Sequence, residues 1–369
     1  MKLAILQENL QKALTTASRF ASTRAQLPIL GNILFSAHKA NIDVSSTNLE
    51  ISVSIKVGAK VEEEGKISIP ARVISELVTN LPKDTLTIET AKEQMKISSK
   101  GFSSTILGMD PTDFPKIPNS VDKEKSLNLA SNDLVAALSQ VIFATSVDET
   151  RPVLTGVLFI TESNSVTLVA TDGFRLSLKK IKVPGIKVGQ KVVLPKLVLS
   201  ELGRVETGDV FFELDQKEKQ AVFAIGETIL SSRLLEGEYP DYEKIIPKKS
   251  ETQAFLDKEE LLRAVKLASV FARDAANIVR LKVQKDAIKV SAESGASGSQ
   301  ETEVEAKVEG AASKDFEIAF NFRFLEEFLN SVKGEEIKME FSATDKPGIF
   351  TDTADSSYLH LIMPVKVQS

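Results

Sequence analysis

The residue types that most often perform catalysis are scarce in this sequence. Only two histidines occur, His38 and His360, and neither has neighbours at metal-ligand spacing or partners that would complete a catalytic triad. Cysteine is absent, which excludes disulfides, thiolate metal sites and cysteine nucleophiles. Neither common glycine-rich phosphate motif occurs, because Gly185 and Gly189 have the wrong spacing. We therefore expect no catalytic residue, no metal and no cofactor, and a structural role for each histidine.

One acidic turn resembles a catalytic turn. It spans Thr171–Arg175 and reads TDGFR, and a counterpart at Thr47–Leu49 lies 124 residues earlier in the chain. A hairpin turn accounts for Asp172 without catalysis, since Asp and Gly both favour turns. The residues beside it remain candidates for binding.

A pattern of domain length recurs three times along the chain. An apolar helical spacing leads into a Phe-Ala pair that begins at Phe20, Phe143 and Phe271. A second helical pattern carries a glutamate at corresponding positions, Glu76, Glu201 and Glu327. Solenoid repeats are about 20–50 residues long, so a period of about 125 residues is that of a whole domain. We predict domains at 1–119, 126–247 and 252–369, with short polar connectors near Asn119–Lys125 and Pro247–Thr252.

Each repeat predicts the same order of elements. A short strand such as Lys2–Ile5 precedes the first helix, and β-branched segments separated by Asn/Asp/Ser turns predict two strands after it. These strands are expected at Ile29–Phe35 and Asn41–Ser46, Val153–Ile160 and Ser165–Ala170, and Ile278–Val283 and Ala287–Ser291. Pro70 and Pro195 suit the first turn of the second helix, where an amide donor is dispensable. Two helices and many antiparallel strands per unit predict an α+β fold with helices on one face of the sheet.

Composition and charge bound the function. Apolar residues make up 42% and charged residues 26% of the chain, as in ordinary soluble proteins. The net charge of −5 argues against wrapping nucleic acid over the whole surface. No apolar run approaches the ~18 residues of a membrane span. The N-terminal segment lacks the apolar core of a signal peptide, and we expect a cytoplasmic protein.

Basic residues nevertheless cluster modestly near the first helices. Lys12 and Arg19 are spaced to share a helix face, as are Arg263, Lys266 and Arg273. Solvated helix faces would explain both groups. If the faces instead line one channel, they would contact phosphates without sequence preference and in a salt-sensitive way.

Along its full length the chain resembles the bacterial DNA polymerase III beta subunit family, the DNA sliding clamps. The resemblance is carried by the three repeats together with Leu27–Asn32, Ala170–Leu176, Gly237–Tyr242 and Met363–Val365. It implies a ring-shaped homodimer of six similar domains around duplex DNA, with the third domain of each subunit against the first domain of the other. It also implies a non-catalytic processivity factor whose partners are the clamp loader, the DNA polymerase III alpha subunit and other proteins with clamp-binding motifs.

The resemblance also implies site residues. A pocket for short protein motifs would comprise Leu154, Thr171, Gly173, Phe174, Arg175, Leu176, Pro240, Lys244, Ile245, Asn321, Phe324, Leu361, Met363, Pro364, Val365 and Lys366. DNA contacts are expected at Arg24, Arg72 and Lys196, and an apolar subunit contact at Val270 and Phe271, for which core packing is the alternative.

Some positions depart from the family pattern. Phe174 stands where His is common, Lys244 and Lys366 where Arg is frequent, and Ala276 where a larger side chain occurs. Lys cannot form the two-pronged contacts of Arg, so partner preference is open. The acidic loop 146–150 inherits no DNA contact.

Two other classes of protein remain open at this point. The chain could be a three-domain peptide-binding scaffold that does not encircle DNA, which its oligomeric state would distinguish. It could also be an enzyme with an unrecognised site, which a metal and nucleotide binding screen would detect.

Overall fold

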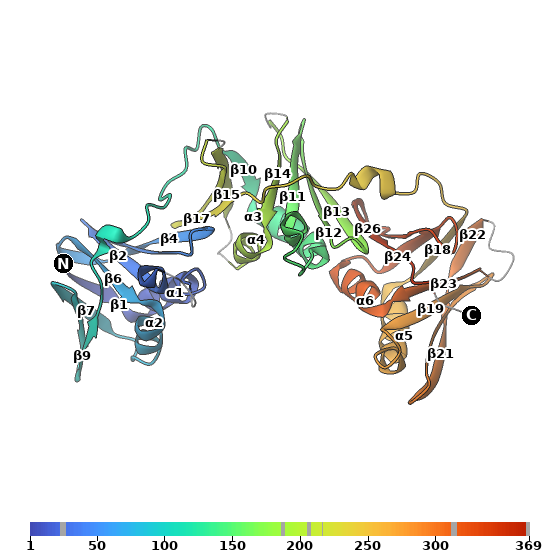
Figure 1. Cartoon of the computed structure of the whole chain (residues 1–369), viewed down its shortest axis with the longest axis horizontal. Coiled ribbons are helices and arrows are strands. Elements are labelled where there is room, and N and C mark those ends of the chain that lie inside the picture. The colour runs from blue at the N-terminus through green and yellow to red at the C-terminus, as the bar shows by residue number, and fades with distance from the viewer. Residues whose placement is uncertain (23–26, 186–188, 205–207, 216, 311–315, 367–369) are drawn as a thin grey trace. The chain divides into compact units, whose positions relative to one another are not determined.

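The computed structural model describes residues 1–22, 27–185, 189–204, 208–215, 217–310 and 316–366. Short helices and antiparallel sheets make up the described chain (Figure 1). The chain forms two compact parts, residues 1–132 with 204–234 and residues 133–203 with 235–369. The second predicted repeat contributes strands to both parts.

The first part holds two sheets. Their strand orders are β5-β1-β7-β8-β9 and β10-β15-β16-β17-β4-β3-β2-β6. The elements are β1 (Lys2–Leu6), α1 (Gln7–Ala17), η1 (Pro28–Gly31), β2 (Asn32–His38), β3 (Asn41–Thr47), β4 (Ile51–Gly58), β5 (Lys60–Glu63), β6 (Gly65–Pro70), α2 (Ala71–Thr79), β7 (Thr85–Ala91), β8 (Gln94–Ser99), β9 (Phe102–Leu107), η2 (Pro111–Asp113), β10 (Leu127–Ala130), β15 (Asp209–Asp215), β16 (Gln220–Ile225) and β17 (Thr228–Arg233).

The second part also holds two sheets. Their strand orders are β14-β11-β12-β13-β26-β25-β24-β18-β22 and β21-β20-β19-β23. The elements are α3 (Ser131–Val141), η3 (Ile142–Ala144), η4 (Pro152–Thr155), β11 (Gly156–Glu162), β12 (Ser165–Thr171), β13 (Arg175–Lys182), β14 (Lys191–Pro195), α4 (Lys196–Leu202), η5 (Tyr242–Ile245), β18 (Thr252–Asp257), α5 (Lys258–Ala272), β19 (Ile278–Val283), β20 (Ala287–Ser294), β21 (Gly298–Glu305), β22 (Lys307–Gly310), β23 (Phe316–Asn321), α6 (Phe322–Ser331), β24 (Glu336–Phe341), β25 (Gly348–Asp352) and β26 (Asp355–Ile362).

The core of the third repeat shows why its helices form where they do. The Asp257 side chain accepts a hydrogen bond of 2.8 Å from the Glu260 amide, which caps the N-terminus of α5. Apolar residues at helical spacing, including Leu261, Val265 and Ala268, are fully buried along one face of α5. That face packs in one cluster with the aromatic side chains of α6 and the sheets, which are Phe320, Phe328, Phe341, Phe350 and Tyr358.

The internal repeat is visible in how the sheets join. In the first part β17, of the second repeat, pairs with β4, of the first repeat. In the second part β26, of the third repeat, pairs with β13, of the second repeat. Val53 pairs with Leu230 in the first junction, and the corresponding residues of the second junction, Ser177 and His360, also pair with each other. The two junctions therefore have the same strand register. Strands of consecutive repeats are therefore hydrogen-bonded across each predicted domain boundary, in a three-domain α+β fold.

Several predicted boundaries were wrong, and proline accounts for most of the differences. Residues 29–31 and 153–155 lie in the 3-10 turns η1 and η4, each with proline at its start, so the strands begin only at Asn32 and Gly156. Pro70 and Pro195 are the last residues of β6 and β14 and precede the helices instead of entering them. Strands β6 and β14 each lie at the edge of a sheet, where a residue that lacks an amide donor is tolerated.

Two of the three Phe-Ala pairs follow the end of the first helix instead of ending it. Helix α1 ends at Ala17, and Phe20 is buried in the turn beyond it. Phe143 lies in η3, after the end of α3, whereas α5 does end at Ala272. The repeated apolar spacing identified residues that face the core, and burial does not require the helix to continue.

Candidate functional site

The turn between β12 and β13 is built by its own side chains. The Thr171 hydroxyl donates to the Arg175 carbonyl at 2.6 Å and accepts from the Gly173 amide at 3.0 Å. The Asp172 carboxylate accepts from the Phe174 amide at 2.9 Å. Gly173 has φ +93°, which only glycine adopts readily. The turn interpretation of Asp172 is confirmed, and the turn leaves Phe174 64% exposed.

The segment after β26 lies against this turn. The Met363 amide donates to the Phe174 carbonyl at 2.8 Å, and the Val365 amide donates to the Ala319 carbonyl of β23 at 2.8 Å. Met363 is 37% exposed, and Pro364 and Val365 are partly buried. Two backbone hydrogen bonds thus fix Met363–Val365 beside Phe174.

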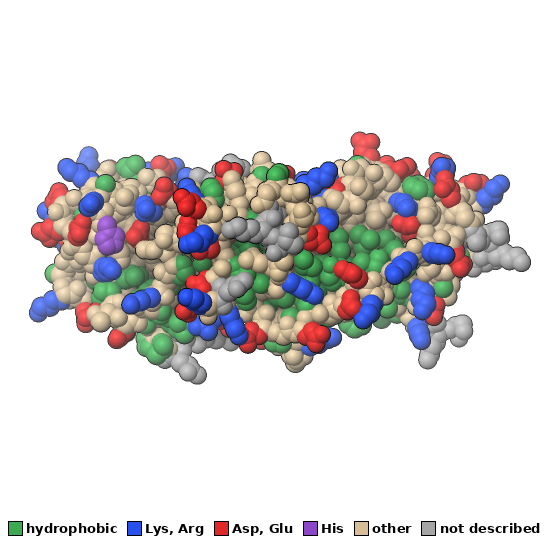
Figure 2. All heavy atoms as spheres, turned by 90° about the horizontal axis from the view of Figure 1, so that it is seen from above, with side chains coloured by type: hydrophobic (Ala, Val, Ile, Leu, Met, Phe, Trp, Pro, Cys, Tyr) green, Lys and Arg blue, Asp and Glu red, His purple; other side chains and the backbone are tan. Residues whose placement is uncertain are grey.

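A buried apolar cluster supports the same region. Leu154, Leu176 and Leu361 are nearly or fully buried in one cluster with Tyr239 and Tyr242. The Tyr239 hydroxyl donates to the Val169 carbonyl at 3.2 Å. These leucines therefore support the surface from beneath. Hydrophobic side chains also gather right of the centre in Figure 2, where β13 and β26 lie.

The predicted pocket also includes residues in η5 and just before it. Pro240, Lys244 and Ile245 are exposed, and the Lys244 ammonium pairs with the Asp241 carboxylate at 2.8 Å. That hydrogen bond to Asp241 raises the pKa of Lys244 above its usual value. We call the exposed apolar set Phe174, Ile245 and Met363 the motif surface.

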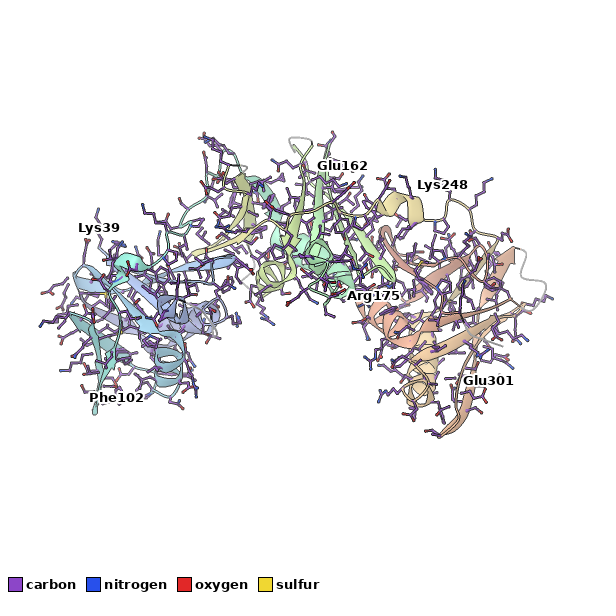
Figure 3. All side chains as sticks on the ribbon, viewed as in Figure 1. Lys39, Phe102, Glu162, Arg175, Lys248 and Glu301 are labelled. Atoms are coloured by element: carbon purple, nitrogen blue, oxygen red, sulfur yellow. The ribbon has the colours of Figure 1, made fainter. Side chains whose placement is uncertain are left out.

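The predicted third-repeat residues have local roles. The Asn321 side chain accepts from the Arg323 amide at 3.0 Å and caps α6. Phe324, also of α6, is partly buried and lies 4.4 Å (ring centroid) from the Arg175 guanidinium. Arg175 itself is buried, and its position is labelled in Figure 3. Lys366 is exposed, and Ala276 has φ +55° in the turn after α5.

The predicted DNA contacts fall in separate places. Arg24 lies outside the described residues. Arg72, on α2, is exposed and pairs with Glu76 at 2.9 Å, whereas Lys196 is the first residue of α4 in the other part. Lys12 and Arg19 line a groove of about 770 Å³ whose walls also carry Lys56 and Arg204. The last two were missed, because neither lies on a first helix.

The predicted subunit contact divides into two roles. Val270 is 60% exposed on α5, whereas Phe271 is partly buried and packs against the third-repeat core. Leu107, at the end of β9, is 69% exposed and was missed. Its position in an apolar strand pattern gave no signal of exposure, because such residues usually face the core.

The two histidines differ in environment. His360 is fully buried, lies 2.6 Å through Nδ1 from the Ser177 hydroxyl, and stacks on Phe328 at a ring-centroid distance of 5.4 Å. Burial, with Arg175 nearby, holds its pKa well below the usual range. His38 is exposed and 4.0 Å from Asp43. No group of His, Cys, Asp and Glu suited to a metal ion occurs among the residues that the structure describes. Within the same residues, no helix has the length and apolar character needed to span a membrane.

Three α+β units joined through their sheets, with exposed apolar residues and a groove lined by basic side chains, are the architecture of a DNA clamp. Family models of the N-terminal, central and C-terminal domains of the DNA polymerase III beta subunit match residues 1–118, 128–241 and 243–366. The chain therefore belongs to the DNA polymerase III beta subunit family.

Individual relatives agree with this assignment. The beta sliding clamps of Staphylococcus aureus and Staphylococcus epidermidis are each 29% identical to the chain, over 99% of both sequences. The Bacillus subtilis sliding clamp structure superposes with a TM-score of 0.94 at 28% identity, and a beta subunit from Eubacterium rectale with 0.92 at 27%, each over 100% of both chains. These findings support a non-catalytic DNA sliding clamp over the peptide-binding scaffold and the enzyme.

Proposed function

We propose that two copies of this chain close into a ring around duplex DNA and tether replication proteins to it. The ring would slide because its DNA contacts are weak, and it would stay on DNA because it is closed. The clamp loader, the DNA polymerase III alpha subunit and other proteins with clamp-binding motifs are the proposed partners, in the cytoplasm of a bacterium. The site residues named above and the domain limits 1–119, 126–247 and 252–369 are part of this proposal.

The strand edges are the observation that carries the proposal. Strands β9, β17 and β26 are equivalent strands of the first, second and third repeats. Strands β4, β13 and β21 are likewise equivalent strands of the first, second and third repeats. β17 pairs with β4 and β26 with β13, whereas β9 and β21 each end a sheet. If a partner's β21 pairs with β9, and the reverse, two copies leave neither edge free.

The register of that pairing follows from the two internal junctions. Ser54 pairs with Ile229 in the junction of β4 and β17, and the equivalent residues Leu178 and Leu359 pair in the junction of β13 and β26. The corresponding pair between subunits is Glu301 with Ser103 of the partner subunit. Both residues are exposed in the single chain, on β21 and β9. Figure 3 labels Glu301 on β21, and Phe102 at the start of β9.

Apolar residues near these edges support burial by a partner. Leu107 ends β9, and Val270 is exposed on α5, which packs against β20 and β21. Phe271 extends the apolar set toward β21, because a side-chain methyl group in place of the Gly298 hydrogen would contact its ring at 3.9 Å. Apolar groups of this kind at a strand edge are typical of the core of a subunit interface.

The charge distribution suits sliding better than fixed binding. The chain is acidic overall, with a net charge of −5, yet Lys12, Arg19, Lys56 and Arg204 line one groove. Together with the proposed contacts at Arg24, Arg72 and Lys196, these cations would attract the DNA backbone without reading its sequence. Few phosphate contacts on an acidic protein allow movement along the duplex.

The motif surface is the proposed site for partner proteins. A short apolar peptide would lie on Phe174, Ile245 and Met363, and Met adapts its shape to different ligands. A Pseudomonas aeruginosa sliding clamp, 23% identical to the chain, is known in a structure bound to griselimycin. We propose that griselimycin binds the motif surface here as well.

The oligomeric state tests the proposal. Light scattering over a dilution series should give a species of twice the subunit mass of 40.2 kDa. A monomer at micromolar concentration would refute ring closure.

A further inference from the structure

The Arg175 side chain is held by protein groups on every side. It is only 8% exposed, its Nε lies 3.0 Å from an Asp172 carboxylate oxygen, and its Nη2 donates to the Phe143 carbonyl at 2.7 Å. Its Nη1 pairs with the Glu327 carboxylate. The Phe324 ring centroid lies 4.4 Å from the guanidinium carbon and that of Phe143 lies 5.4 Å from it. Each of the three nitrogens has an acceptor within the protein, so a ligand has little of this side chain to contact.

These contacts connect two repeats. Asp172 and Phe143 belong to the second predicted repeat, in the β12–β13 turn and in η3, whereas Glu327 and Phe324 lie on α6 of the third. Arg175 also directly follows Phe174, whose carbonyl accepts from the Met363 amide. One guanidinium therefore fixes the turn that presents Phe174 and the helix that presents Phe324.

The repeat shows that a strand junction forms without this arginine. In the junction of β4 and β17, Ile51 occupies the position of Arg175 and is buried. The turn before it has the same hydrogen bonds, since the Leu49 amide donates to the Thr47 hydroxyl at 3.0 Å and the Ile51 amide donates to Asn48 at 2.9 Å. Neither the turn nor the strand pairing requires a guanidinium, so Arg175 serves something particular to the second junction.

We propose that Arg175 is a positioning residue for the motif surface. It holds the Phe174 turn and α6 in one fixed arrangement, so that the surface is formed before a partner binds. Binding then costs less ordering of the protein, which raises affinity. The inference rests on the proposed function of the motif surface and replaces the expectation that Arg175 contacts the motif itself.

Charge and geometry make arginine hard to replace. Asp172 has only 16% of its side chain exposed, so removing the cation would leave a largely desolvated carboxylate without its charged partner. Lysine keeps the charge, but its single ammonium group lacks the planar fork with which Arg175 serves three acceptors. We therefore expect Arg175→Lys to restore little of what Arg175→Met loses.

Griselimycin binding by surface plasmon resonance tests the proposal. We expect Arg175→Met to weaken affinity at least about tenfold, mainly through a slower association rate, because fewer molecules have the binding-competent arrangement. Phe174→Ala should instead mainly raise the dissociation rate, because it removes a contact. Glu327→Gln is the milder variant, and combining it with Arg175→Met should add little, since both act through one contact. Arg280→Gln removes an exposed ion pair with Glu317 in the same repeat and should change nothing.

The outcomes separate the two proposals. If wild-type protein fails to bind griselimycin, the motif surface is wrongly assigned and the role of Arg175 falls with it. If wild-type protein binds, and Arg175→Met and Glu327→Gln bind with unchanged affinity and association rate, only the positioning role is refuted. An equal restoration of affinity by Arg175→Lys would also refute it, because charge alone would then suffice.

Discussion

Truncating one exposed leucine should weaken the dimer by a calculable amount. Leu107 ends β9, and 69% of it is exposed in the single chain, so most of its apolar surface is available for burial by a partner. Fully burying a leucine side chain contributes about 1.5–3 kcal/mol. Leu107→Ala keeps only the first carbon and should therefore cost about 1–1.5 kcal/mol per interface.

Symmetry doubles this cost. A closed two-subunit ring has two equivalent interfaces, so the substitution occurs twice and should weaken association by about 2–3 kcal/mol in total. Since 1.4 kcal/mol is a factor of ten, the dimer dissociation constant should rise about 30- to 140-fold.

Sedimentation equilibrium over a dilution series measures that constant directly. Leu197→Ala is the matched control, because Leu197 is 46% exposed on α4, which belongs to neither proposed edge strand, and should leave the constant unchanged. Circular dichroism should show both variants folded. If Leu107→Ala leaves the dimer constant within a factor of two of wild type, the assignment of β9 to the interface is refuted.

Three further predictions concern the other sites. Removing residues 363–369 should abolish griselimycin binding but leave the dimer mass unchanged, and surviving affinity in an isothermal titration would contradict the motif surface. Arg72→Gln and Lys196→Gln should each weaken duplex binding and reduce the slope of log affinity against log salt by about 0.9, as fluorescence anisotropy would show. The pKa of His360 is lower in the folded protein than the value of about 6.5 expected in the unfolded chain. The stability that neutral His360 supports is therefore fully present above pH 6.5 and is lost as pH falls toward the folded pKa. Below pH 6.5 the free energy of unfolding should fall by up to about 1.4 kcal/mol per pH unit from this group, and urea titrations of His360→Gln should lack that component.

Sequence periodicity predicted the repeat and the fold class, because each copy of the fold buries apolar residues at corresponding positions. The buried pattern of α5 and the strand Ile278–Val283 were both readable from apolar spacing. Proline positions were misread, because Pro28 and Pro152 begin 3-10 turns that an apolar pattern does not distinguish from strand. Pairing between repeats, as of β17 with β4, involves residues far apart in sequence and gives no local signal.

The site residues were identified by resemblance, and their physical roles required the structure. The resemblance placed both Phe174 and Arg175 in the pocket, yet Phe174 is exposed and Arg175 is buried. Alternation along the chain cannot show that Arg175 contacts Glu327, a residue of the next repeat. The exposure of Leu107 likewise depends on β9 being the last strand of its sheet.

The absence of cysteine allows a direct test of ring closure on DNA. Ser103→Cys with Glu301→Cys places one thiol on each proposed edge, at a separation that a disulfide can bridge if the strands pair as proposed. The register-shifted pair Thr105→Cys with Glu303→Cys is the control and should not cross-link.

The decisive measurement is retention of the cross-linked protein on a circular plasmid after a high-salt wash. The account predicts that protein oxidised in the presence of the plasmid co-elutes with the circle and is released when the plasmid is cut once. Equal retention on circular and cut DNA, or no retention on either by protein that is cross-linked at both interfaces, would contradict a ring that encircles the duplex.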